Sequence, residues 1–302
     1  MKPRRAVRRR TKRSVNRGGG KTFFVVSLLI LIFAAAYYFI GDYIFPGEYV
    51  EPAAGEIIVS FLDVGQGDSI LIRTVDHAVL IDGGEHRARN VVLDYLRNAG
   101  ITRLDYVIAT HPHSDHIGGL VTVLGRVDVG RVVMPDIMHN TVTFESFLEA
   151  IENNNIPVKF PVAGDRVQVG LIDLTVISPT ADFSGSLNDA SIVLRLNHGR
   201  TSFLFTGDAE SAAELNMVNS GMVISSDVLN VGHHGSRTST TQVFLDAVDP
   251  AVAVISLAAN NRYGHPHREV IELLESRGIQ ILRTDESGTI RMITNGERIY
   301  LY

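Results

Sequence analysis

Residues 110–116 read THPHSDH, so three histidines and one aspartate fall within six consecutive positions. His111 and His113 are two apart, and in extended backbone their side chains point to the same side. One metal ion could therefore bind both imidazoles. Asp115 and His116 are adjacent, so they point in different directions and can reach a second ion beside the first. Imidazole and carboxylate together suit zinc, and also manganese or iron.

The segments on either side of this motif indicate an ordered site rather than an accidental cluster. Residues 104–109 form a largely apolar run, which predicts a buried strand that ends at the motif. Gly118 and Gly119 follow the motif, and such glycines are typical of a tight, ordered turn. A histidine-rich surface loop, the alternative, needs neither feature. The sequence therefore predicts a strand that leads directly into metal ligands.

This pattern, His-x-His-x-Asp-His after a strand, resembles the metal-binding motif of the metallo-β-lactamase superfamily. Three other segments narrow the resemblance: residues 61–69 (FLDVGQGDS), 206–208 (TGD) and 231–236 (VGHHGS). They are similar to the extracellular hydrolase domain of the ComEC family, the bacterial DNA-uptake channel proteins. The resemblance covers roughly residues 56–302. It implies a metal-dependent hydrolase.

The fold expected from this resemblance is α+β, a four-layer αββα sandwich with two mixed sheets between outer helices. The predicted elements agree with it, because strands are numerous and helices are interleaved among them. Apolar runs predict strands over residues 104–109, 129–134 and 201–205, and helical spacing predicts helices over residues 90–99 and 117–124.

Two further strand ends carry candidate ligands. Asp208 follows a buried run, and a carboxylate at a strand end can bridge two cations, one oxygen to each. His233 and His234 follow another strand and are flanked by glycines. By analogy with related enzymes we assign His233 to the second metal and a substrate contact to His234, although their order could be reversed. The resemblance thus implies two divalent ions, zinc or alternatively manganese, with these ligands: His111, His113, Asp115, His116, Asp208 and His233.

One ligand of the superfamily is missing. A histidine about twenty residues before the bridging aspartate is usual there, but counting back from Asp208 reaches Asn188. His198 is only ten residues away and is read as a residue of a hairpin turn. The first metal therefore either has one protein ligand fewer, which puts its occupancy in doubt, or keeps an extra open position for water or substrate.

Other polar residues are candidates for substrate contact or for support of the ligands. In the superfamily an aspartate at the position of Asp82 commonly supports the histidine loop, and capping a turn is its alternative role. His265 precedes a proline, which keeps it on a loop; it belongs either to the rim of the site or to loop packing. Ser191 is expected to donate a hydrogen bond at the rim. The full set is Asp68, Asp82, Asn188, Ser191, His234 and His265.

The N-terminal part of the chain predicts a membrane anchor. Residues 1–22 carry ten lysines and arginines and no acid, and residues 23–41 carry no charge. About 20 apolar residues cross a bilayer as a helix, and the positive-inside rule leaves the basic arm in the cytoplasm. Residues 42–55 read as a linker to an extracytoplasmic domain at residues 56–302. The alternative is a signal peptide whose cleavage releases a secreted protein.

Composition limits the chemistry. The chain has no cysteine, so disulfides and thiolate metal sites are excluded. Ten of its 28 basic residues lie in the N-terminal arm, which leaves 18 against 33 acidic residues, a formal net charge of −15 for the rest. Such a body offers no broad cationic track for a nucleic-acid backbone.

The predicted reaction is hydrolysis by water that the two ions share and whose pKa they lower, with Asp115 and Asp208 as catalytic residues. The first hypothesis is a membrane-anchored phosphodiesterase or nuclease, with DNA or another phosphodiester as substrate. The second is hydrolysis of another ester, an amide or a lactone, such as a phosphocholine ester, a wall component or a β-lactam. The third is a non-catalytic binding module.

Overall fold

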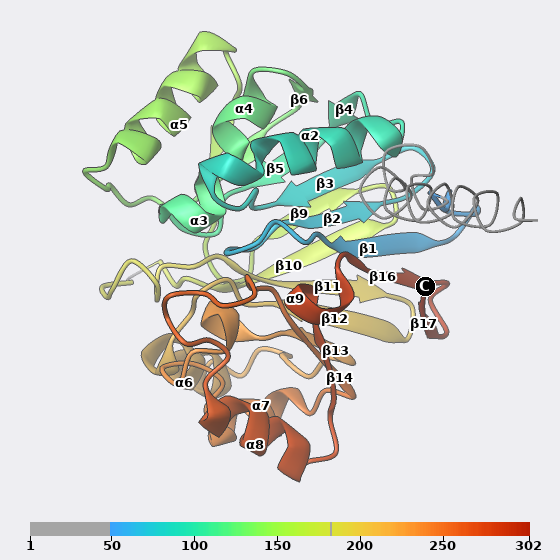
Figure 1. Cartoon of the computed structure of the whole chain (residues 1–302), viewed down its shortest axis with the longest axis vertical. Helices are drawn as coiled ribbons and strands as arrows, with labels where there is room; N and C mark the ends of the chain where they lie inside the picture. Colours follow the sequence, from blue (N-terminus) through green and yellow to red (C-terminus); the bar gives the residue numbers. More distant parts are fainter. Residues whose placement is uncertain (1–48, 182) are drawn as a thin grey trace, which may run out of the picture. The chain divides into compact units, whose positions relative to one another are not determined.

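Two β-sheets lie against each other in the computed structural model, and helices cover both outer faces (Figure 1). The structure describes residues 49–181 and 183–302, of which Glu51–Tyr302 form a compact unit. The first sheet has the strand order β17 (Ile299–Leu301), β16 (Ile290–Thr294), β1 (Ile57–Phe61), β2 (Ile70–Arg73), β3 (Ala78–Ile81), β5 (Tyr106–Ile108), β7 (Val132–Val133) and β8 (Val158–Lys159). The second has the order β15 (Gln280–Arg283), β14 (Val252–Ile255), β13 (Val228–Asn230), β12 (Thr201–Phe205), β11 (Val193–His198), β10 (Ile172–Ser178) and β9 (Arg166–Val169).

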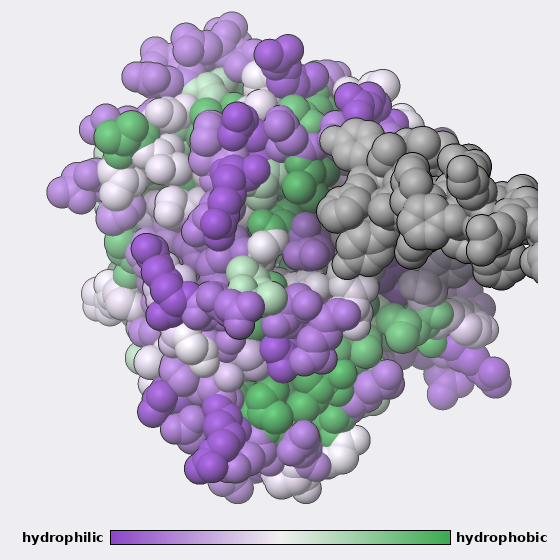
Figure 2. All heavy atoms as spheres, viewed as in Figure 1, coloured by the Kyte–Doolittle hydropathy of each residue, from purple (hydrophilic) through white to green (hydrophobic). Residues whose placement is uncertain are grey.

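The helices form the two outer layers. The outer side of the first sheet carries α2 (Arg89–Asn98), α4 (Leu120–Leu124) and α5 (Val142–Asn153), and that of the second carries α6 (Ser211–Asn219), α7 (Gln242–Val248) and α8 (Arg268–Ser276) (Figure 1). Shorter elements are η1 (His86–Ala88), α3 (Ser114–Ile117), η2 (Gly232–Gly235), α9 (Thr284–Ser287) and the strand pair β4 (Arg103–Leu104) and β6 (Asp128–Val129). Hydrophilic residues cover much of both helical layers on the face seen in Figure 2. The α+β fold with four layers is therefore confirmed.

Strand β12 is covered on both of its faces, which explains its consecutive apolar residues. Successive side chains of a strand point to opposite faces, and both faces of this sheet are covered. Phe203 and Phe205 belong to the core between the sheets, where Phe205 packs against Phe61 with ring centroids 6.2 Å apart. Leu204 belongs to the core beneath α6, α7 and α8. Burial on both faces thus explains the consecutive apolar residues at positions 203–205.

Parallel strands bring the candidate ligands to one end of the two sheets. In the first sheet β3 pairs in parallel with β5, and in the second β12 pairs in parallel with β13. Parallel strands end at the same edge, where ligands of α/β sheets usually bind. Asp82 and the histidine motif follow the first pair, and Asp208 and residues 232–235 follow the second. The two edges meet where the Ile192 N–H donates to the Thr110 carbonyl over 2.9 Å.

Three predicted elements are divided. The run at residues 104–109 is split into β4 and β5 at Asp105, whose carboxylate accepts the Ala78 N–H over 3.1 Å. The run at residues 129–134 is likewise split, into the end of β6 and β7, and residues 117–124 into the end of α3 and α4. The latter break lies at Gly119, where a Cβ atom would lie 2.0 Å from the Gly83 carbonyl oxygen. Strand β9 and helix α7 were not predicted, and both are short.

The predicted basic arm and membrane span, residues 1–22 and 23–41, lie outside the described residues, as do residues 42–48 of the predicted linker. Within residues 49–181 and 183–302, no helix is long and apolar enough to cross a membrane. The compact unit begins at Glu51 and so includes residues 51–55 of that linker.

Candidate metal centre

The first group of ligand candidates is built at the end of β5. His111 is fully buried, and its Nε2 atom lies 2.9 Å from Nδ1 of His113, so the two rings converge as their spacing predicts. The same His111 Nε2 atom lies 3.6 Å from Oδ2 of Asp208. One ion can therefore be reached by His111, His113 and Asp208 together, and their ligand atoms all lie within 4.8 Å of one another.

The second group lies at the start of α3. It consists of Asp115, His116 and His234, whose ligand atoms also fall within 4.8 Å of one another. Oδ2 of Asp115 lies 3.5 Å from Nε2 of His234. His116 is fully buried. The adjacent Asp115 and His116 thus lie together in a second group beside the first, where the sequence analysis expected them to reach a second ion.

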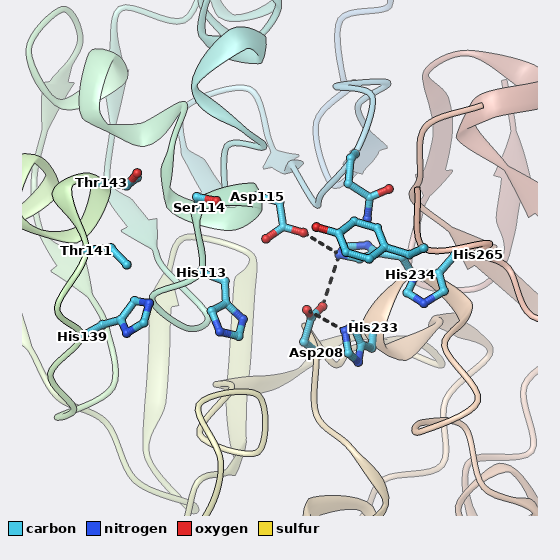
Figure 3. Close-up of a pocket in the computed structure, with 12 residues that line it drawn as sticks. His113, Ser114, Asp115, His139, Thr141, Thr143, Asp208, His233, His234 and His265 are labelled. Carbon is cyan, nitrogen blue, oxygen red and sulfur yellow. Dashed lines mark ion pairs between the residues drawn. The ribbon is translucent and has the colours of Figure 1, made fainter. Parts of the chain in front are cut away.

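Asp208 faces each of the two groups with one oxygen. Figure 3 shows its carboxylate between His113 of the first group and His234 of the second. Its Oδ2 faces His111, whereas its Oδ1 lies 3.2 Å from Nε2 of His116 and 3.4 Å from Nε2 of His234. Its backbone N–H donates to the buried Ser191 hydroxyl over 3.1 Å. This is the arrangement expected of a carboxylate that bridges two cations.

The two adjacent histidines of η2 have different surroundings. Their positions differ from the assignment expected from the sequence, which gave His233 to the second metal. Both have left-handed backbone, with φ of 52° at His233 and 55° at His234. His234 is 2% exposed, and its Nδ1 is 2.9 Å from the Ser256 carbonyl, which leaves Nε2 directed at the second group. His233 lies on the other side of Asp208, with Nε2 3.7 Å from Oδ2 and Nδ1 3.2 Å from Glu210. The structure therefore places His234, rather than His233, with the second group.

Asp82 combines the two roles considered for it. Its Oδ1 accepts the Thr110 N–H over 2.8 Å and so holds the turn before the motif. Its Oδ2 lies 2.8 Å from Nδ1 of His116. A carboxylate in this position fixes the imidazole tautomer that presents Nε2 to a metal. Asp68 is also buried, and its ligand atoms group with Asp208 and His234.

The remaining predicted residues lie around the centre. The Asn188 Nδ2 group donates to Oε1 of Glu210 over 3.3 Å, the same oxygen that faces His233. The Nδ1 atom of His198 lies 3.3 Å from the Thr294 hydroxyl, and His198 lines no part of the site. The ring of His265 lies 5.6 Å from that of His233, centroid to centroid, at the edge of the cavity.

A cavity of about 360 Å³ opens at the two groups. Several of its lining residues were not predicted, because none of them is a ligand type at a ligand spacing that the motif predicts. Gln66 lies inside the quoted segment 61–69, and its flanking glycines are the one signal that could have drawn attention to it. The unpredicted lining residues are Gln66, Ser114, His139, Thr141, Thr143 and Tyr263.

The imidazoles of the first group favour the neutral form, which is the form that binds a cation. Burial lowers the pKa of His111 well below its ordinary value, and the neighbouring His116 lowers it further. Burial also lowers the pKa of His113. Both rings are therefore neutral at pH 7 and offer lone pairs, which metal binding requires.

In the second group the carboxylates favour the protonated form of the imidazoles. Burial by itself lowers the pKa of His234, but the carboxylates of Asp208 and Asp115 outweigh it and raise the pKa to about 9. The pKa of His116 is likewise raised, because Asp208 and Asp82 outweigh its burial. A metal cation can displace such protons and take over their pairing with the carboxylates.

Buried polar atoms that make no hydrogen bond indicate whether these residues are suited to hold a metal ion. Within the described part of the chain, Nε2 of His116, Nε2 of His234 and Oδ1 of Asp208 have no hydrogen-bond partner. Buried polar atoms that make no hydrogen bond, although they lie close to a charged group, need an explanation. Two nitrogens and one oxygen that face one another at 3.2–3.4 Å fit a divalent cation. The residues present therefore suit the group implied by the motif.

Replacing Asp82 by asparagine is expected to weaken binding at the second group by about 10- to 100-fold, the usual cost of losing an outer hydrogen-bond partner. Asparagine tolerates the left-handed φ of 56° at this position, but its amide cannot accept from both Thr110 and His116. Calorimetric titration with Zn²⁺ measures the effect, and the exposed Asp128 replaced by asparagine is the control. Unchanged zinc affinity would limit Asp82 to its role in the turn.

Comparison with known proteins gives three findings. The family described as the metallo-beta-lactamase superfamily matches residues 62–259. ComE operon protein 3 of Bacillus subtilis is 36% identical over 251 residues (77% of this chain and 32% of that protein), and competence protein ComA of Neisseria gonorrhoeae is 34% identical over 238 residues (78% and 32%). The chain thus spans about a third of the length of these relatives. The metallo-beta-lactamase fold protein YhfI from Bacillus subtilis shares the fold, with a TM-score of 0.52 at 11% identity over 82% of this chain and 100% of that one.

Proposed function

Since this chain belongs to the metallo-β-lactamase superfamily, as a ComEC-like metal-dependent hydrolase, we propose that it cleaves phosphodiesters. The observation that carries the proposal is Asp208, whose two oxygens face two separate groups of ligands. Two divalent ions held there would activate water as the nucleophile and stabilise the charge that develops on both oxygens of an in-line displacement at phosphorus. Zinc is the ion that the donors favour, with manganese as the alternative.

The residues of the chain have distinct parts in this reaction. His111 and His113, with Oδ2 of Asp208, would hold the first ion, and Asp115, His116 and His234, with Oδ1, the second. The carboxylate of Asp115 lies at the cavity and can orient the attacking water. Burial opposes its ionisation, but His234 and His116 outweigh this and keep the pKa of Asp115 below its ordinary value. It therefore stays ionised at neutral pH.

The rim of the cavity supports a nucleotide-like substrate. The guanidinium of Arg262 packs over the ring of Tyr263, 4.9 Å from its centroid, and Tyr263 lines the cavity. An exposed aromatic ring with an adjacent cation suits a base or sugar next to a phosphate. The formal −15 of the chain beyond residue 22 favours a short contact over a long one along the backbone of DNA.

The experiment is a substrate panel with the full-length protein loaded with zinc or with manganese. We expect metal-dependent cleavage of bis-(p-nitrophenyl) phosphate and of single-stranded DNA, and its loss after chelation. Chromogenic esters and a chromogenic β-lactam are the comparison substrates. If only these comparison substrates are cleaved, the protein is a different hydrolase and not a phosphodiesterase. If the protein binds two ions and cleaves no substrate, a binding module is favoured.

The place of action proposed is outside the cytoplasm, with the chain anchored by residues 23–41. Support comes from the ten cations ahead of this uncharged segment and from the competence proteins among the relatives. External protease applied to intact cells should remove an epitope tag placed after Tyr302. Protection of the tag, with release only after lysis, would place the domain in the cytoplasm.

A further inference from the structure

The side chain of Gln66 is buried at the cavity beside the two ligand groups. It is 3% exposed, and it lines the cavity together with Asp115, Asp208 and His234. Neither its Nε2 nor its Oε1 atom has a hydrogen-bond partner among the described residues. A buried amide that makes no hydrogen bond destabilises the folded protein. A group that enters the cavity is therefore needed to complete its hydrogen bonds.

The backbone holds Gln66 directly against the ligand loop. Its neighbours Gly65 and Gly67 have φ of 74° and 111°, which other residues rarely adopt. A Cβ atom on Gly67 would lie 1.8 Å from the Asp115 carbonyl oxygen, so this loop and the loop of Asp115 are in close backbone contact. The position of the amide is thus fixed relative to the metal ligands.

The chemistry of the cavity indicates what Gln66 binds. An uncharged carboxamide offers two N–H donors and one acceptor. Among the described residues that line the cavity, the acidic side chains are Asp115 and Asp208, and both are members of the ligand groups. Nε2 donates to no acceptor among the described residues, so the substrate or water can supply one. A neutral donor close to two cation sites suits an anionic, non-bridging oxygen of the group being attacked.

We propose that Gln66 is a substrate-binding residue whose Nε2 donates a hydrogen bond to a non-bridging phosphoryl oxygen, while Oε1 accepts from water in the cavity. The inference rests on the proposed phosphodiesterase function. Through Gln66, the segment 61–69 would contact the substrate directly. The hydrogen-bond acceptors on the group that is cleaved would then help to determine which substrates are bound.

The test uses the full-length, metal-loaded protein and inorganic phosphate as the probe. Gln66→Met keeps the length of the side chain and removes both hydrogen-bonding groups; Gln66→Ala also removes its bulk. We expect unchanged metal content, and a phosphate affinity reduced by about 10- to 100-fold, the effect of one hydrogen bond to a charged oxygen. KM for bis-(p-nitrophenyl) phosphate should rise. In Gln66→Glu the loss should be larger, because a carboxylate repels the anion and cannot donate. Gln168→Ala, at an exposed position of β9, is the matched control.

The outcomes separate this inference from the function on which it rests. If the wild type cleaves phosphodiesters while Gln66→Met keeps its phosphate affinity and KM, the inference is overturned and the function stands. If the wild type cleaves none but the variant binds phosphate more weakly, the contact is supported and the function fails. If the wild type neither cleaves nor binds phosphate, both fail. Loss of metal or of folding in all three variants would assign Gln66 to structure and overturn its role as a substrate contact.

Discussion

Replacing Asp208 by asparagine is expected to reduce phosphodiester cleavage by about a thousandfold or more and to lower the metal content of the protein. Removing one charge-stabilising group from an active site costs about 10²–10³ in rate, and Asp208 faces both ligand groups with its two oxygens. The asparagine keeps one carbonyl oxygen but has an amide in place of the other. It also loses the negative charge that faces His111, His116 and His234.

Bound zinc and manganese, measured by mass spectrometry on the same samples as the rate, separate a metal effect from a folding effect. Asp128→Asn is the control, because its carboxylate is exposed and pairs with Arg103 at the surface. Such surface pairs contribute about 0–1 kcal/mol. Full metal content and full activity in Asp208→Asn would show that the two groups do not share this carboxylate.

Replacing His234 by alanine is expected to remove one bound ion, whereas the same change at its neighbour His233 should leave metal content intact. Nε2 of His234 is buried and faces both Asp208 and Asp115, and the Ser256 carbonyl holds its ring by Nδ1. His233 is partly exposed and is absent from the ligand groups. We expect the rate to fall in His234→Ala by more than the 10- to 100-fold typical of an outer hydrogen-bond partner.

Each variant is the control for the other, because both remove a histidine side chain and the two positions are adjacent. His233→Ala should change mainly KM, since this ring lines the cavity without joining a ligand group. Equilibrium dialysis against zinc gives the number of ions for each variant. Loss of the ion in His233→Ala and its retention in His234→Ala would restore the assignment made from the sequence.

The histidine motif shows how far local spacing determines a site. Side chains two apart in extended backbone point to the same side, and His111 and His113 do converge, with nitrogens 2.9 Å apart. Asp208 was placed by its position at the end of a buried run. The four-layer fold was implied by the resemblance to the metallo-β-lactamase superfamily, and the alternation of predicted strands and helices agreed with it. The convergence of His111 and His113 and the strand end at Asp208 depend on backbone periodicity, which is local and can be predicted from the sequence.

Other features depend on contacts between segments that are distant in sequence. The choice between His233 and His234 is set by the left-handed backbone of η2 and by the Ser256 carbonyl. Ser256 lies in the loop after β14, 22 residues from His234. Asp105 divides a predicted strand because it accepts the Ala78 N–H from another strand. No periodicity in the sequence encodes either contact.

The sequence by itself determined the fold class, the donor chemistry and most of the residues that gather at the ends of the strands. The tertiary structure alone decided which adjacent histidine joins the second group and which oxygen of Asp208 faces each group. It also decided that the amide of Gln66 makes no hydrogen bond to any other described residue. The physical reason is that side-chain direction along a strand is local, whereas pairing, burial and the remaining unpaired atoms arise only when distant segments pack together.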